Sequence, residues 1–147
     1  MPQENNYYTI LITGSRKWKD TGTIRKIIIS AQSKHPDKKV RFIFGDCRGG
    51  ADQIAYGFCL SYNVNYVRFM AHWDKFGKKA GPIRNKEMVE YKPDEAYAFR
   101  EPGALNTGTD GCIDLCLKAG VKVTIIGELR NRSSSNGTDQ NHQAGVL

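Results

Sequence analysis

The chain has 147 residues, of which 39% are hydrophobic and 25% are charged, and its formal net charge at pH 7 is +7. This length suits one domain with a sizeable core, and no apolar run approaches the roughly 20 residues that a membrane-spanning helix needs. The positive charge is either ordinary surface charge or the mark of an anionic partner, a phosphorylated metabolite or a nucleic acid. Because Lys and Arg are spread over several segments, we expect a small phosphorylated ligand more than a nucleic acid.

Five short runs rich in Val, Ile, Phe and Tyr predict buried strands, and a helical pattern follows each of the first four. The predicted strands are Tyr8–Thr13, Val40–Phe44, Val64–Met70, Glu95–Phe99 and Val121–Ile126. The predicted helices are Thr23–Ser33, Ala51–Tyr62, Ile83–Tyr91 and Asp110–Ala119. Strands that alternate with helices pair in parallel through right-handed crossovers. The sequence therefore predicts an α/β fold, a single Rossmann-like domain with an open, mostly parallel sheet of about five strands and helices on both faces.

We expect this domain to occupy residues 7–129. Residues 1–6 form a short polar extension without an apolar signal segment. Residues 130–147 are rich in Ser, Asn, Gln and Gly, a composition typical of a disordered tail. A cytoplasmic location is the expectation.

The four cysteines support a reducing, intracellular setting, because none forms a CxxC pair or a disulfide framework. We therefore expect no metal site. Cys112 and Cys116 lie four residues apart on a predicted helix, and we interpret them as apolar core residues. Cys47 precedes Arg48, which could lower the thiol pKa and make a nucleophile of it.

The segment after each of the first four predicted strands combines glycine with Ser, Thr, Arg or Asp. Gly14-Ser15-Arg16 follows the first strand, Gly45 through Asp52 the second, and Gly108-Thr109-Asp110 comes after the fourth. Parallel strands end at one edge of the sheet, where open α/β sheets bind ligands. Glycine lets a ligand approach the backbone, although tight turns alone also need glycine. Their convergence favours a ligand site.

The segment after the third strand, Ala71 to Asn85, reads AHWDKFGKKAGPIRN and is the most basic of these loops. Pro82 suits the first turn of a helix, and the N–H groups of such a turn bind anions beside Lys and Arg. Trp73 and Phe76 could supply a face for a flat ring. Phosphate and a flat ring together indicate a nucleotide, whereas the alternative is a solvated basic loop anchored by one Trp. We expect this loop to be mobile without ligand and to close over it.

The ordered combination of these loops resembles the YspA/YpsA-like branch of the SLOG superfamily over about Tyr8 to Ile126. The matching pieces are Ile12 through Arg16, Gly45 through Asp52, Trp73 through Asn85, and Gly108-Thr109-Asp110. The resemblance implies a Rossmann-like nucleotide-binding domain of the kind found in bacteria, phages and mobile elements. It also implies a homo-oligomer, and we expect apolar residues such as Val89 and Tyr91 not all to fit one core.

Relatives in this superfamily imply three activities. Cytokinin-activating phosphoribohydrolases cleave the N-glycosidic bond of nucleoside monophosphates with a Pro-Gly-Gly-x-Gly-Thr-x-x-Glu motif, other relatives bind nucleotide or ADP-ribose-derived signals, and the DNA-processing protein binds single-stranded DNA. This chain departs from the hydrolase motif. When it is aligned on Gly108-Thr109, the catalytic Glu falls near Cys112 or Ile113. A glycosidase would have to draw its acid from Asp46, Asp52 or Asp74.

Several of these residues have a structural interpretation beside the functional one. Asp52 either favours the helix dipole or binds a ribose hydroxyl. Asp74 either holds Lys75 or Arg84 in place or is catalytic, and Asp110 is expected to cap its helix. The candidate ligand-binding residues are Gly14, Ser15, Arg16, Gly45, Asp46, Arg48, Gly49, Gly50, Asp52, Trp73, Lys78, Lys79, Gly81, Pro82, Arg84, Asn85, Gly108, Thr109 and Asp110.

Four further side chains leave their roles open. Asn85 either reads the edge of a base or bonds to its own helix start, and His72 is either an acid or base or a packed or surface side chain. Arg16 and Arg48 are expected to capture phosphate, with a plain surface role as the alternative.

We expect a nucleotide or ADP-ribose-derived ligand at the carboxyl edge of the sheet, with no required cofactor, in a sensing or sequestering role. The alternatives are a phosphoribohydrolase-like enzyme and a nucleic-acid-binding module.

Overall fold

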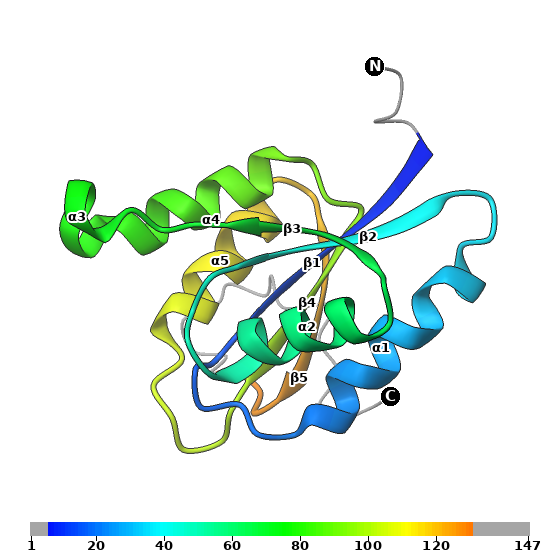
Figure 1. Ribbon diagram of the computed structural model, residues 1–147. Helices are drawn as coiled ribbons and strands as arrows, with labels where there is room; N and C mark the ends of the chain where they lie inside the picture. Colours follow the sequence, from blue (N-terminus) through cyan, green and yellow to red (C-terminus); the bar gives the residue numbers. More distant parts are fainter. Residues whose placement is uncertain (1–5, 131–147) are drawn as a thin grey trace.

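Five parallel strands form one sheet in the order β3-β2-β1-β4-β5 (Figure 1). The computed structural model describes residues 6–130, so all but the first residue of the expected tail (130–147) and most of the expected N-terminal extension (1–6) lie outside the described residues. The strands are β1 (Tyr7–Gly14), β2 (Lys39–Gly45), β3 (Asn65–Phe69), β4 (Glu95–Arg100) and β5 (Lys122–Gly127). The helices are α1 (Thr21–Lys34), α2 (Gly50–Ser61), α3 (Trp73–Phe76), the 3-10 turn η2 (Gly77–Lys79), α4 (Ala80–Glu90) and α5 (Thr107–Lys118). The predicted α/β fold is confirmed.

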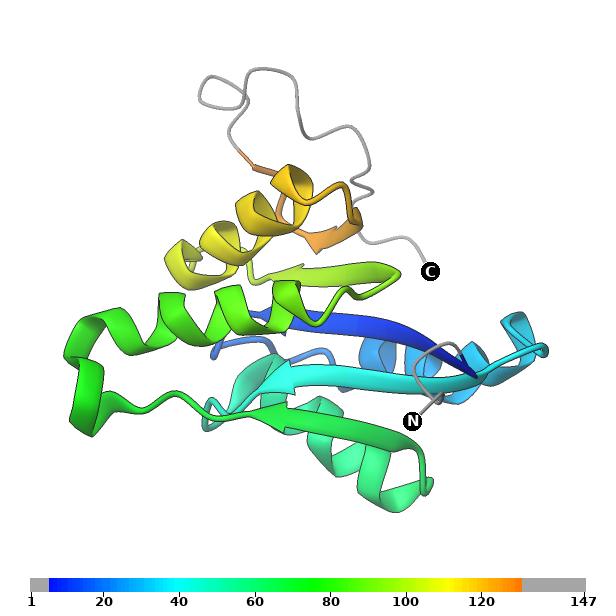
Figure 2. The ribbon, with the colours of Figure 1, turned by 90° about the horizontal axis from the view of Figure 1, so that it is seen from above.

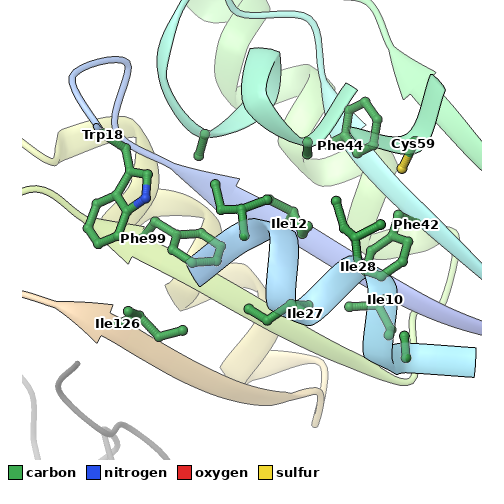
Figure 3. Close-up of a cluster of buried hydrophobic side chains, with 14 of the residues drawn as sticks. Ile10, Ile12, Trp18, Ile27, Ile28, Phe42, Phe44, Cys59, Phe99 and Ile126 are labelled. Carbon is green, nitrogen blue, oxygen red and sulfur yellow. The ribbon is translucent and has the colours of Figure 1, made fainter. Parts of the chain in front are cut away.

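Helices cover both faces of the sheet (Figure 2). Strand alternation explains this, because neighbouring side chains of one strand point to opposite faces. In β1, Ile10 and Ile12 pack under α1 and α2, whereas Leu11 packs under α4 and α5. The core on the first side includes Phe42, Phe44 and the ring of Trp18 (Figure 3).

Two helices begin three residues earlier than the sequence pattern predicted. The third predicted helix starts at Ala80 rather than Ile83, and the last starts at Thr107 rather than Asp110. Gly81 and Gly108 suggested loops, yet each lies in a first helical turn. Pro82 is confirmed in the first turn of α4, where its missing N–H removes no helical hydrogen bond.

The segment expected to be a basic loop is largely helical. α3 and η2 lead directly into α4, and α3 lies at the outer end of α4, beyond the end of β3, in both views (Figures 1 and 2).

The apolar residues that we expected to be left over fit into the core. Val89 is buried among residues of β4, β5 and α5, and Tyr91 packs against the same cluster and meets the ring of Phe69 edge-on. The hint of an oligomer from these two residues was therefore wrong. Within residues 6–130, no helix is long and apolar enough to cross a membrane.

Candidate functional site

The carboxyl ends of β1 and β4 form the switch point of the sheet. β2 and β3 are added on one side of β1, and the chain then crosses to the other side to add β4 and β5. In open α/β sheets, the crevice at such a switch point is where ligands bind. The loops that follow β1 and β4 therefore lie where the fold itself favours a site.

The loop after β1 is fixed by its neighbours. The Ser15 N–H donates to the Phe99 carbonyl at 2.9 Å, and the Ser15 carbonyl accepts from the N–H of Ala51 and of Trp18, both at 3.1 Å. Gly50 has φ +71°, and a Cβ at this position would collide with the Ser15 carbonyl. The start of α2 and the loop after β1 are thus locked together.

Close packing therefore accounts for part of the glycine pattern. A Cβ on Gly14 would approach that of Ala51 to 2.7 Å. Ser15 is buried, whereas Arg16 and Arg48, which follow β1 and β2, are exposed. The structure thus presents these two expected phosphate-binding guanidinium groups to solvent from adjoining loops.

A cluster of buried polar side chains surrounds Arg84 of α4, next to the loop that follows β2. Its Nη1 donates to Asp46 Oδ1 at 3.0 Å and its Nε donates to Asn85 Oδ1 at 2.8 Å. Asp52 Oδ2 accepts from the N–H of Cys47 at 3.2 Å. A Cβ on Gly45 would overlap the Arg84 guanidinium, and would lie 2.8 Å from Asp52 Oδ2. The absence of a side chain at Gly45 makes room for the buried ion pair.

This cluster corrects the interpretation in which Asp74 holds Arg84 in place. Asp46 holds Arg84, and Asp74 does not, because Asp74 is exposed on α3. Asn85 also joins α4 to α5, since its Nδ2 donates to the Gly108 carbonyl at 3.4 Å. Arg84, Asp52 and Asn85 are each more than nine-tenths buried. Their contacts support the shape of the site from below.

Burial is the main influence on the pKa of two groups in this cluster, the Asp52 carboxyl and the Cys47 thiol. It raises the pKa of the Asp52 carboxyl, and the nearby Arg84 guanidinium and the Cys47 N–H oppose that rise. Burial also raises the pKa of the Cys47 thiol, and Asp52 raises it further. The expectation of a lowered Cys47 pKa was therefore wrong, because the buried carboxylate and desolvation outweigh the nearby arginine.

The first turn of α5 contains Gly108, Thr109 and Asp110. Asp110 is not the cap, because it accepts from Arg100 Nε at 2.8 Å and from Arg100 Nη2 at 3.2 Å. Asn106 occupies the cap position, but among the described residues its side chain caps no helix N–H. The N–H groups at the start of α5 are thus left without a side-chain cap at the edge of the switch point.

Asn106 itself has a fixed orientation. Its Nδ2 donates to the carbonyls of Ala104 at 3.0 Å and Glu101 at 3.3 Å. Its Oδ1 is buried and, within residues 6–130, has no hydrogen-bond partner. A buried acceptor of this kind calls for a donor from water or from a ligand.

The α3 arm, defined as residues 70–79, is attached to the Arg84 cluster at its base, where the Ala71 N–H donates to Asp46 Oδ1 at 3.3 Å. Trp73 and Phe76 are 46% and 37% exposed, and Lys78 and Lys79 are exposed on η2. A Cβ added to Gly81, in the first turn of α4, would lie 3.4 Å from the Trp73 ring. His72 is also exposed, so the structure does not support its packed alternative.

The position where the hydrolase motif would carry its Glu is closed. Cys112 is 0% and Ile113 is 1% exposed, and both pack in the core beside Cys116. The interpretation of Cys112 and Cys116 as core residues is confirmed. Among residues 6–130, no group of three His, Cys, Asp or Glu side chains could hold a metal ion.

Sequence reasoning passed over a pocket of about 440 Å³ at the switch point. Its walls include residues from the loops after β1 and β4 and from the end of β5: Trp18, Lys19, Asp20, Glu101, Pro102 and Ile126. The rule that selected Arg16 could have found Trp18 and Glu101, because each follows a predicted strand by a few residues.

Comparisons with known proteins find relatives of this chain. The family described as "YspA, cpYpsA-related SLOG family" matches residues 8–76. The Gene 61 protein of Mycobacterium phage D29 is 37% identical over 123 residues, covering 81% of this chain and 96% of that protein.

Among solved structures, the X-ray structure of DNA processing protein A (DprA) from Streptococcus pneumoniae is similar with a TM-score of 0.63 and 12% identity. That match covers 92% of this chain and 56% of the DprA chain, so this chain spans little more than half of that neighbour. At this identity the likeness shows the shared fold.

Proposed function

The chain belongs to the YspA, cpYpsA-related SLOG family, and we propose that it binds a nucleotide or an ADP-ribose-derived ligand at the carboxyl edge of its sheet. The proposed role is that of a sensor or a sequestering protein. The ligand's phosphate would lie between the loop after β1, the loop after β2 and the start of α5.

One observation carries this proposal. Two exposed arginines, Arg16 and Arg48, stand on loops that are locked together at the switch point, beside a helix start whose first N–H groups have no side-chain cap. A guanidinium binds phosphate through two parallel hydrogen bonds, and the start of a helix favours an anion. The buried pair of Arg84 and Asp46 would support this surface rather than touch the phosphate.

Calorimetric titration with AMP and with ADP-ribose tests the proposal. Replacing Arg16 with Ala should weaken binding by about 1–3 kcal/mol, the range for losing a hydrogen bond to a charged group. The matched control is Lys39→Ala, which removes one exposed positive charge at the opposite edge of the sheet. Equal affinity of both variants, with the fold intact, would remove Arg16 from the site.

The same titrated samples decide whether the ligand is turned over. Chromatography after incubation should recover intact nucleotide if the protein binds without reaction. Release of free base would establish N-glycosidic cleavage, and Asp46, Asp52 and Asp74 would then be the acids to replace.

A second candidate function, the binding of single-stranded nucleic acid, is favoured by the α3 arm. Exposed Trp73 and Phe76 lie beside Lys75, Lys78 and Lys79, and stacking on aromatic rings with phosphate contacts to cations is how such strands are bound. Binding of a labelled oligonucleotide at rising salt tests this function. A steep loss of affinity with salt, and a further loss in Trp73→Ala, would support it.

A further inference from the structure

The 440 Å³ pocket at the switch point lies beside the proposed phosphate site and is not used by it. We propose that this pocket, walled by Trp18, Pro102 and Ile126, holds the nucleobase of the ligand. The inference rests on the proposed nucleotide function and names the part of the protein that reads the base. The sequence pattern predicted that Trp73 would supply a face for a flat ring, but Trp73 lies on the exposed α3 arm.

The apolar wall of the pocket is rigid. Trp18 is only 7% exposed. Its Nε1 donates to the Asp20 carbonyl at 2.8 Å, and the centre of its ring lies 5.2 Å from that of Phe99. Figure 3 shows Trp18 beside Phe99, with Ile126 on the neighbouring strand. A wall that is held on several sides loses little conformational entropy when a flat ring packs against it.

Gly127 lets this wall form. It has φ +100°, and a Cβ at this position would lie 2.8 Å from Cζ3 of Trp18 and would collide with the Arg100 carbonyl. The end of β5 can therefore approach the indole only because residue 127 has no side chain.

The polar rim favours a neutral ring with N–H donors over a second phosphate. Glu101 Oε1 accepts from the Lys19 N–H at 3.3 Å, and the carboxylate can accept further hydrogen bonds through Oε2. Asp20 also lines the pocket and caps α1 through the N–H of Gly22. Two carboxylates repel a phosphate, but they accept from the amino and imino groups of a nucleobase.

Backbone hydrogen bonds join the segments that line the pocket to the loops of the proposed phosphate site. The Trp18 N–H donates to the Ser15 carbonyl, which also accepts from the start of α2. The Glu101 carbonyl accepts from Asn106 at the start of α5. Base and phosphate groups of one ligand thus fall on adjoining parts of the same two loops.

Titration with AMP, GMP, CMP and ribose 5-phosphate tests the inference. The wild-type protein should bind at least one of the three nucleotides about tenfold or more tightly than ribose 5-phosphate, which carries the phosphate and sugar without a base. Thr23→Phe, which places a ring into the pocket from α1, should reduce that nucleotide to the affinity of ribose 5-phosphate. The matched control is Thr21→Phe, at an exposed residue on the same helix that does not line the pocket.

Fluorescence provides a measurement that needs no change in the pocket. Trp73→Phe leaves Trp18 as the one tryptophan of the chain, and its emission should change with the nucleotide but not with ribose 5-phosphate. Equal binding of ribose 5-phosphate and all three nucleotides, or equal nucleotide affinity of Thr23→Phe and Thr21→Phe, would overturn the base pocket and leave the proposed function standing. If neither these four compounds nor ADP-ribose binds, the proposed function fails and the base pocket fails with it.

Discussion

The two edges of the sheet differ in how their polar side chains are used. At the amino edge, Tyr8 donates to Glu95 at 2.9 Å and stacks on His35, and the Arg41 guanidinium lies over the rings of Tyr7 and Tyr91. These groups satisfy one another within the protein. The carboxyl edge also contains matched pairs, but it adds locked glycine loops, exposed arginines and a pocket.

This difference shows that polar residues at a sheet edge do not by themselves indicate a ligand-binding site. Both edges hold buried charges with partners, as expected for any stable fold. What distinguishes the carboxyl edge is unsatisfied capacity: the uncapped start of α5, the buried Asn106 Oδ1 and the exposed Arg16, all within the described residues. The following predictions test whether the buried part of that edge supports the site or belongs to it.

The largest effect is expected from Arg84→Ala. It leaves Asp46 and Asp52 at a buried position without their cation, which should lower the free energy of unfolding by about 3–5 kcal/mol. Urea unfolding followed by circular dichroism measures this. Lys86→Ala, on an exposed face of the same helix, should change stability by less than about 0.5 kcal/mol. Equal effects of the two variants would show that Arg84 does not hold the edge together.

A glycine pair on α2 tests the locked loops. Gly50→Ala forces a side chain against the Ser15 carbonyl at a positive φ, and should cost about 2–4 kcal/mol of stability. Gly57→Ala, where nothing lies within 4 Å of an added Cβ, should instead stabilise the helix by about 0.5–1 kcal/mol. Thermal unfolding of both variants measures the contrast, which disappears if the loops are not locked.

The raised pKa of Asp52 predicts a pH dependence of stability. Because burial raises the pKa in the folded protein above the ordinary 3.8, the folded state binds this proton more tightly than the unfolded state. Its contribution is therefore present below about pH 4 and is lost as pH rises through the raised pKa, at up to about 1.4 kcal/mol per pH unit. Asp52→Asn should lose less stability than the wild type over this window. Parallel pH profiles of the two proteins would contradict the assignment.

The smallest effect is expected at the amino edge. Tyr8→Phe removes the hydrogen bond to Glu95 and should lower the free energy of unfolding by about 0.5–1.5 kcal/mol. Nucleotide affinity, measured by calorimetry, should not change. A loss of affinity as large as that of Arg16→Ala would break the distinction between the two edges.

The amino-acid pattern of the chain is sufficient to predict the strands, the parallel sheet and the edge at which the candidate residues gather. Alternation of apolar runs with helical patterns depends on local spacing, and the carboxyl ends of parallel strands must share one edge. It also determined that Gly14, Gly45 and Gly50 matter, although it could not say whether for a ligand or for packing. The sequence pattern did not predict the helix starts at Ala80 and Thr107, because glycine in the first turn of a helix has the same local pattern as glycine in a loop.

Which charged residues are buried and which are exposed depends instead on how the elements pack against one another. Arg84 and Asp46 are 38 positions apart in the chain, and their pairing depends on how α4 crosses the end of β2. The pocket likewise needs residues that follow β1 and β4 together with the end of β5, where Gly127 leaves room for the ring of Trp18. The spacing of residues along the sequence does not predict such long-range contacts, because they depend on the strand order and on the close packing of side chains between loops.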